Sequence, residues 1–256
     1  MAHINDAEVV YIPTNDSDFV LTPEKLQKAI DDHPKAVGLV LTYPNNPTGV
    51  EYSEQQLKNL ADIIKKTDLF VFSDEIYSTL NYVGKHTSIA GYLPEQTVVL
   101  NGVSKSHAMT GARVGFVAAP KELISQIVKI HQFAITAASD TSMAGAAAAL
   151  SPAGDKSNEK MRQTYLKRRN YLIPEFEKLG FKVAAPDGAF YLFLKIPADR
   201  DQDDLAFARE LAYKAKVGLI PGSCFGQGGE GYLRLSYAAS DENLQEAVKR
   251  LTEYLA

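Results

Sequence analysis

Three polar segments, each directly after an apolar run, carry the side chains of this sequence that are best suited to chemistry. They are PNNPTG (residues 44–49), SDEIY (73–77) and SKSHAMTGAR (104–113). Together they contain a lysine amine, an aspartate carboxylate and an arginine guanidinium, which proteins use as nucleophile, proton acceptor and anion ligand. In open α/β sheets such groups collect at the carboxyl ends of strands. We therefore expect a site where these three segments meet.

Each segment taken alone also has a structural explanation. Prolines, asparagines and a glycine are typical of a turn, which suffices for PNNPTG. Asp74 is a suitable cap for a helix that begins at Glu75, and Arg113 alone fits a solvent-exposed charge. Most lysines also lie on solvated faces, so Lys105 needs the context of the other segments. The order of the three segments after successive strands is what favours a functional interpretation.

Other motifs carry less weight. GQGGEG, with Gly226, Gly228 and Gly231, matches the spacing of a dinucleotide-binding loop, but a strand follows it where a helix is required. A plain loop is the better interpretation. Ser104 lies outside any GxSxG motif, so a serine hydrolase is not supported. Four histidines are interpreted as surface or structural side chains, because their spacing fits no metal site: His33, His86, His107 and His131.

The elements that position these segments alternate between apolar runs and helix-period stretches, which is typical of a parallel α/β sheet. Strands are predicted at residues 9–13, 36–43, 69–75, 97–102 and 114–119. Helices are predicted from Thr22 onward and at residues 53–66 and 121–133, and an Ala-rich segment follows at residues 143–150.

SPAGDKSNEK (residues 151–160) is predicted to divide the chain into a larger first domain, 1–154, and a smaller α+β domain, 155–256. The second domain is predicted to begin with a long charged helix at about residues 159–179. Its further elements are the strands KVAA (182–185) and AFYLFLKI (189–196), a helix at 203–215, the strands VGLIPG (217–222) and YLRLSYA (232–238), and a helix at 241–255.

Composition narrows the function classes. The chain has 256 residues, 45% of them hydrophobic and 23% charged, which is ordinary for a globular protein. Its net charge of -4 and dispersed basic residues argue against nucleic acid as a partner. Cys224 is the only cysteine, which excludes an internal disulfide and favours a reducing compartment. No stretch is long and apolar enough for a membrane span, so we expect a cytoplasmic protein with no membrane partner.

In combination, PNNPTG, SDEIY and SKSHAMTGAR closely resemble the class I/II aminotransferases, pyridoxal 5'-phosphate (PLP) enzymes of fold type I. The similarity continues through FVLTPEKLQKAI, GAFYLFL and PGSCFGQGGEGYLRLSYA, so it covers essentially the whole chain. The sequence looks closest to bacterial enzymes that act on aromatic, aspartate-like or N-acetyl-diaminopimelate substrates. The resemblance implies an α/β fold, with a partial large PLP-binding domain at 1–154 built on a mostly parallel sheet and a small C-terminal α+β domain at 155–256.

The resemblance also implies how the cofactor is held. Lys105 matches the lysine that forms a Schiff base with PLP, and Arg113 matches the arginine that binds its phosphate. Many relatives have a phosphate-binding serine three residues before the lysine, where this chain has Gly102; Ser104 is the nearest hydroxyl that can compensate. Asp74 matches the carboxylate that pairs with the pyridine nitrogen and keeps it protonated.

Two further roles follow from the same resemblance. Asn46 and Tyr77 match the pair that hydrogen-bonds the phenolic oxygen of PLP, and Asn46 also belongs to the substrate site. Strand alternation places Arg234 on one face with Tyr232 and Ser236. Arg234 matches the arginine that binds the α-carboxylate of the substrate, a bidentate task for which lysine is a poor substitute.

The implied activity is ping-pong transfer of an amino group between an L-amino acid and a 2-oxo acid, with Lys105 as general base and acid. A homodimer is expected. A PLP-dependent carbon-sulfur β-lyase, a non-catalytic PLP-fold module such as the effector domain of a transcription regulator, and an inert remnant are the alternatives. The sequence starts at what matches a mid-domain strand, so a fragment truncated at the N-terminus is expected, with an inactive fragment as one alternative and residues 1–3 left over from cloning.

Overall fold

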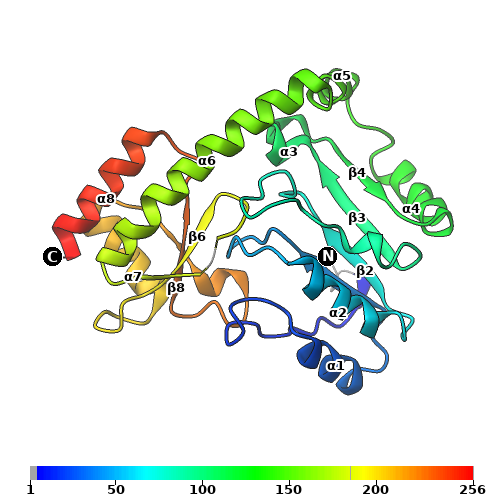
Figure 1. The fold of residues 1–256 in the computed structure, drawn as a ribbon, viewed down its shortest axis with the longest axis horizontal. Coiled ribbons are helices and arrows are strands. Elements are labelled where there is room, and N and C mark those ends of the chain that lie inside the picture. Colours follow the sequence, from blue (N-terminus) through cyan, green and yellow to red (C-terminus); the bar gives the residue numbers. More distant parts are fainter. Residues whose placement is uncertain (1–4, 185, 256) are drawn as a thin grey trace.

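The computed structural model describes residues 5–184 and 186–255, which contain two four-stranded sheets (Figure 1). The strand order is β1-β2-β3-β4 in the first sheet and β5-β6-β8-β7 in the second. The predicted remnant at residues 1–3 and the last residue of the predicted strand at 182–185 lie outside the described residues.

The first sheet is mostly parallel. Its strands are β1 (Gly38–Thr42), β2 (Phe70–Asp74), β3 (Thr97–Gly102) and β4 (Gly115–Ala118). β1, β2 and β3 run parallel, and β4 is antiparallel to β3. Thr42 pairs with Asp74, and Asp74 pairs with Leu100, so the carboxyl ends of three strands meet at one edge. The three polar segments all leave the sheet from this edge.

Two capped helices cover one face of the first sheet. α1 (Pro23–Asp32) begins where the Thr22 side chain accepts a hydrogen bond from the Lys25 backbone N–H, with proline at the first helical position. α2 (Glu54–Ile64) begins with a reciprocal capping box between Ser53 and Gln56. Their apolar faces and the inner face of the sheet form one core: Leu26, Leu41, Leu57, Leu60, Ile64 and Val71.

The opposite face of the first sheet is exposed in the described residues. Val40 is 72% exposed, and Phe72 and Phe116 are also exposed. Val40 and Phe72 alternate along β1 and β2 with the buried Leu41 and Val71, as the pleat of a strand requires, whereas all four residues of β4 are exposed.

The remaining helices link the two sheets. After β3 come α3 (Val103–Ser106), a 3-10 turn (Thr110–Ala112), α4 (Lys121–Ala134) and α5 (Asp140–Ala149). α6 (Pro152–Lys178) then runs from the side of α5 toward α8 (Figure 1).

The second sheet is antiparallel. Its strands are β5 (Lys182–Val183), β6 (Tyr191–Lys195), β7 (Ile220–Pro221) and β8 (Tyr232–Ser236). Between them lie α7 (Asp204–Glu210), a π-helical turn (Leu211–Ala215) and a 3-10 turn (Gly222–Phe225), and α8 (Asp241–Leu255) closes the chain. The largest core joins this sheet to α6, α7 and α8 through side chains such as Phe176, Leu192, Phe207, Leu235 and Leu251.

Two sequence predictions differ from the structure. The predicted strand at residues 9–13 is wrong, because no strand among residues 5–184 and 186–255 pairs with this segment; Ile12 instead packs against the first core. The long charged helix begins at Pro152 rather than at residue 159, because Ser151 caps it by accepting from the Gly154 N–H. α6 is therefore continuous across residues 154 and 155, and the predicted division into two domains there stays a prediction.

The segment before α1 contacts the second sheet. The ring of Phe19 packs edge-on against Phe193 and Tyr232, with ring centroids 5.4 and 5.3 Å away. In residues 5–184 and 186–255, no helix combines the length and the apolar character that crossing a membrane requires.

Candidate active site

Lys105 lies on the short helix α3, which starts directly after β3. Its Nζ is 5.8 Å from the ring centroid of Tyr77 and 6.0 Å from that of Phe190. The side chain is partly buried. The amine therefore faces aromatic rings at the edge of the first sheet, where the strand ends meet, and Ser104 precedes it on the same helix.

The close approach of β3 and β4 explains why residue 102 is a glycine. A Cβ at this position would lie 2.8 Å from Gly115 Cα and 2.8 Å from the Val114 carbonyl oxygen. Both distances are shorter than van der Waals contact allows, and both involve backbone atoms that cannot rotate away. A serine three residues before Lys105 is thus sterically excluded by the present spacing of the two strands.

Asp74 is the last residue of β2 and is half-buried. One of its carboxylate oxygens accepts a hydrogen bond from the Ile76 N–H at 3.2 Å. Burial raises the pKa of the Asp74 carboxyl and the charge of Glu75 raises it further, while the Ile76 N–H and the more distant Lys105 act to lower it. A carboxylate in this environment is stabilised by a cation placed beside it.

Tyr77 and Tyr191 form a buried hydroxyl pair between the two sheets. Their hydroxyl oxygens are 2.9 Å apart, although the residues are 114 positions apart in the sequence. Burial raises the pKa of the Tyr77 hydroxyl well above its usual value, and the hydrogen bond to Tyr191 acts in the same direction. Tyr77 is therefore a neutral hydrogen-bonding group.

Arg234 projects from β8 toward the loop that carries Asn46. Its Nη1 donates a hydrogen bond to Asn46 Oδ1 at 2.8 Å. The guanidinium carbon lies 4.5 Å from the ring centroid of Tyr191 and 4.6 Å from that of Phe225, so the group is held between two rings. Its Nε is buried and has no hydrogen-bond partner in the described part of the chain. This arrangement offers a buried, unpaired donor to an anion.

Arg113 lies apart from these contacts. It is exposed, and its Nη1 donates to the carbonyl oxygen of Thr110 in its own loop at 2.9 Å. Its backbone has a φ of 54°, a left-handed conformation that non-glycine residues adopt rarely. The structure thus gathers Lys105, Tyr77, Asn46 and Arg234 around Tyr191, but it shows no contact between Arg113 and Lys105.

The aromatic side chains of the site were not predicted from the sequence. Tyr191, Phe190 and Phe225 were not selected, because aromatic residues in strand-like runs are usually core residues. The stretches GAFYLFL and PGSCFG, which contain them, were part of the family resemblance and supplied the available signal. His86, interpreted from the sequence as a surface or structural histidine, is a structural one, since it lies between two buried carboxylates.

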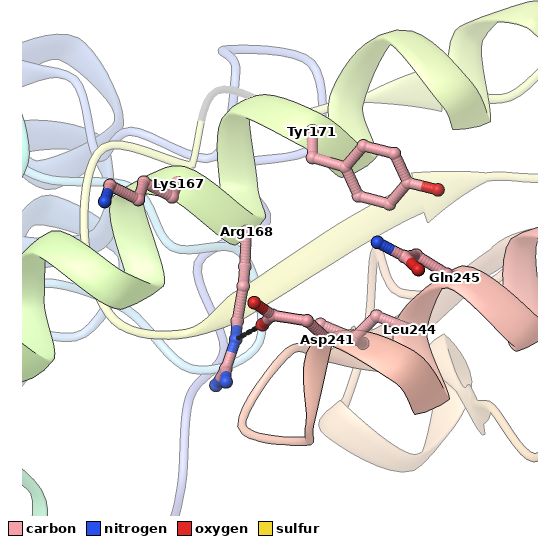
Figure 2. Close-up of a pocket in the computed structure, with 6 residues that line it drawn as sticks. All are labelled: Lys167, Arg168, Tyr171, Asp241, Leu244 and Gln245. Carbon is pink, nitrogen blue, oxygen red and sulfur yellow. Dashed lines mark hydrogen bonds and ion pairs between the residues drawn. The ribbon is translucent and has the colours of Figure 1, made fainter.

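A separate hollow lies between α6 and α8 (Figure 2). Arg168 Nε bonds Asp241 Oδ1 at 2.6 Å there, and Tyr171 and Gln245 lie nearby. The α6 residues that line it lie in the half of this helix nearer to α8, whereas α3 lies by the other end of α6 (Figure 1). The hollow has no part in the candidate active site.

Comparison with known proteins shows the family to which this chain belongs. The family model "Aminotransferase class I and II" matches residues 1–251. A probable N-acetyl-LL-diaminopimelate aminotransferase of Bacillus subtilis is 43% identical over 245 residues, which are 96% of this chain and 61% of that protein. An aspartate aminotransferase of Pyrococcus horikoshii is 37% identical, over 99% of this chain and 65% of that protein.

Solved structures agree with the sequence comparison. An aromatic aminotransferase of Pyrococcus horikoshii superposes with a TM-score of 0.90 at 36% identity, covering 97% of this chain and 67% of that one. An aspartate aminotransferase of Thermus thermophilus with maleate has a TM-score of 0.90 at 34% identity, covering 96% and 64%.

This chain therefore spans somewhat less than two thirds of the length of the curated relatives described above. The predicted fold class, α/β of fold type I, is confirmed by these structures. The chain belongs to the class I and II aminotransferase family.

Proposed function

We propose that this site binds PLP and transfers an amino group between an L-amino acid and a 2-oxo acid. The observation that carries the proposal is the grouping around the Tyr77–Tyr191 pair. A lysine amine lies near one ring, and the guanidinium of Arg234 lies on the other. The site thus offers an amine for a carbonyl group and, close to it, a donor for a carboxylate.

The residues present fit PLP. Asp74, whose carboxyl group is half-buried and lacks a close cation, suits the protonated pyridine nitrogen. Asn46 and Tyr77 would bond the phenolic oxygen, Lys105 would bond the aldehyde carbon, and Ser104 and Arg113 would bind the phosphate. Because Gly102 excludes a side chain, the phosphate contacts in this turn fall to Ser104 and to backbone N–H groups of α3.

When bound, PLP supplies an aldehyde for the amino group and a ring that accepts the electron pair left by the departing α-proton. The chain's own residues would move the α-proton and hold the cofactor in place. Lys105 would be the base that removes the α-proton of the substrate and the acid that returns it. Asp74 would hold a positive charge on the pyridine nitrogen, and Tyr77 would remain a neutral donor because its pKa is raised.

Arg234 would orient the substrate. Its unpaired Nε and the second terminal nitrogen can bind a carboxylate, while Nη1 keeps its bond to Asn46. The rings of Tyr191 and Phe225 restrict the guanidinium to one plane, which lowers the entropy lost on binding. Both an amino acid and a 2-oxo acid carry this carboxylate, so one site serves both halves of the reaction.

The donor side chain and the assembly are part of the proposal. The names of the relatives point to aromatic, acidic and diaminopimelate-type donors, and the Thermus thermophilus structure was solved with the dicarboxylate maleate. We propose a cytoplasmic homodimer. Light scattering of the purified chain tests the dimer, since a monomeric mass at working concentration contradicts it.

The first experiment tests the cofactor bond. The chain is mixed with PLP, its visible absorbance is recorded, and the bond is fixed with borohydride and mapped by mass spectrometry. We expect one label, at Lys105, and none in Lys105→Ala; Lys121→Ala, at the exposed start of α4, is the matched control. A label elsewhere, or none, contradicts the proposal.

The second experiment separates transamination from β-elimination. Amino donors of the three types are supplied with and without a 2-oxo acid. We expect a new amino acid that appears only when the 2-oxo acid is present. Pyruvate and ammonia from a cysteine conjugate without any added 2-oxo acid would identify a lyase instead.

A further inference from the structure

A group of buried charges lies beside the proposed cofactor site. It consists of Glu51, Glu75 and His86, named the triad below. Nδ1 of His86 is 3.1 Å from Glu51 Oε2, and Nε2 is 3.0 Å from Glu75 Oε2. Glu51 and Glu75 are only 7% and 4% exposed. The aminotransferase roles described above use none of the three side chains.

The contacts of the triad define its charge. An ionised carboxylate only accepts hydrogen bonds, so an imidazole that bonds one on each nitrogen must be doubly protonated. The other bonds to the two carboxylates all come from donors: the Ser73, Ser88 and Tyr43 hydroxyls, the Asn81 amide and the Tyr52 backbone N–H. The ring of Tyr43 stacks on His86 with centroids 5.1 Å apart. The triad is therefore an imidazolium between two carboxylates.

The pKa values are consistent with this geometry. Burial alone would lower the pKa of His86, but the bonds to Glu51 and Glu75 raise it to about 9. Although burial acts in the opposite direction, the bonds from His86, Ser88 and Ser73 leave the pKa of Glu75 below its usual value.

The triad connects two segments of the active site. Glu75 directly follows Asp74 at the end of β2. Glu51 directly follows the loop of residues 44–50 that carries Asn46, named the Asn46 loop. Two backbone bonds close this loop, from Asn45 N–H to the Val50 carbonyl (2.9 Å) and from Gly49 N–H to the Asn45 carbonyl (2.8 Å). His86 comes from neither segment and bonds to both.

We propose that His86 is a positioning residue for the cofactor site, which fixes the Asn46 loop relative to the strand end at Asp74 through its ion pairs with Glu51 and Glu75. This role rests on the proposed function, because it aligns groups that would hold PLP. His86 itself contacts neither cofactor nor substrate. Loss of one proton would leave a neutral imidazole that can donate to only one of the two carboxylates, and both buried carboxylates would lack a counter-charge, which is strongly unfavourable.

The charged groups around the triad do not replace His86. Lys85, Glu159 and Arg162 line the hollow outside it, and Arg162 is paired with Glu159 at 2.7 Å. Asp187 lies near Glu51 and has Arg169 as its closest cation, at 3.8 Å. Tyr43 donates weakly to Glu75 at 3.4 Å. His86 is thus the cation in direct contact with Glu51 and Glu75 among the described residues.

The first test measures the charge of His86 directly. The whole chain is labelled with 15N-histidine, and the ring nitrogens are observed by NMR at pH 8. We expect both nitrogens of His86 to be protonated at this pH, which lies above the ordinary pKa of a histidine. The signal is assigned by its loss in His86→Gln or, if that variant does not fold, by its shift in Glu51→Gln. A neutral His86 overturns the proposal.

The second test measures PLP affinity without the covalent bond. Three proteins are compared by equilibrium dialysis at pH 7.5 and pH 10: Lys105→Ala alone, with His86→Gln, and with the control His131→Gln. At pH 7.5 we expect His86→Gln to weaken binding by about tenfold, a usual cost of removing a group that orients a ligand. At pH 10, where His86 has lost its proton, the difference should fall below about threefold.

The outcomes are distinguishable. Equal affinity at pH 7.5, or a difference that is unchanged at pH 10, overturns the positioning role while the proposed function stands. Failure of all three proteins to bind PLP overturns the proposed function and the positioning role together. The NMR result then still shows whether the imidazolium itself exists.

Discussion

Nη1 of Arg234 donates a hydrogen bond to Asn46 Oδ1 at 2.8 Å, across 188 positions of sequence. This bond joins β8 of the second sheet to the loop after β1 of the first. Arg234 and Asn46 are both groups that we propose to bind ligand. A carboxylate bound to Arg234 would therefore couple the two sheets, because one guanidinium would contact both this ligand and the loop that carries Asn46.

Replacing Arg234 by lysine tests the carboxylate site. An ammonium cannot bond Asn46 and a carboxylate in one plane, and it stacks less well between Tyr191 and Phe225. We expect KM for the amino donor to rise about 100-fold, which corresponds to about 3 kcal/mol. Steady-state kinetics measure this, with the exposed Arg209→Lys as control. An unchanged KM with lower kcat would assign Arg234 to another role.

Removing the hydroxyl of Tyr191 tests the pair with Tyr77. Tyr191→Phe keeps the ring that stacks on Arg234 but leaves the buried Tyr77 hydroxyl without this partner. We expect the free energy of unfolding to fall by about 1–2 kcal/mol, as measured by urea denaturation. Tyr213→Phe, on a side chain that is 76% exposed, should have no effect. Equal effects of the two changes would contradict the importance of the pair.

The triad predicts how stability depends on pH. The pKa of His86 is raised in the folded chain to about 9 from an ordinary value of 6.5. The protonated form therefore stabilises the fold fully below pH 6.5, and this contribution is lost as the pH rises through 9. We expect a loss on the order of 2–3 kcal/mol between pH 6.5 and pH 10, measured by urea denaturation.

His86→Gln should flatten this dependence, whereas the exposed His131→Gln should retain it. Stability that falls equally with pH in His86→Gln would mean that other groups cause the loss.

Adding a side chain at Gly102 tests the steric explanation for the missing serine. In Gly102→Ser the new Cβ would meet backbone atoms of Gly115 and Val114 at 2.8 Å. We expect a loss of about 1–3 kcal/mol in the free energy of unfolding and no gain in PLP affinity. Gly111→Ala, which has open space around its Cβ, is the matched control. A stable Gly102→Ser protein that binds PLP more tightly would show that β3 and β4 can separate at little cost.

Much of the fold could be predicted because its signals are local. Thr22 with Pro23, and Ser53 with Gln56, specify where α1 and α2 begin, since a cap involves side chains within one turn. The apolar runs at residues 69–75 and 97–102 became β2 and β3 for a similar reason: each is a continuous stretch suited to a buried parallel strand.

Predictions failed where a local pattern depends on a distant partner. The apolar segment at residues 9–13 resembles a strand, but a strand exists only where another strand bonds to it, and none of the described strands does. His86 has no metal-ligand spacing in the sequence, and its partners lie 35 and 11 positions away.

The sequence by itself determined the order of the strands and helices, the polar segments that end three strands, and the family to which Lys105, Asp74 and Arg234 point. Only the tertiary structure decided which side chains meet: Arg234 with Asn46, Tyr77 with Tyr191, and His86 with two buried glutamates. The physical reason is the distance along the chain over which each interaction acts. Capping and periodicity act within a few residues, whereas these pairings arise when packed cores bring together segments that are far apart in the chain.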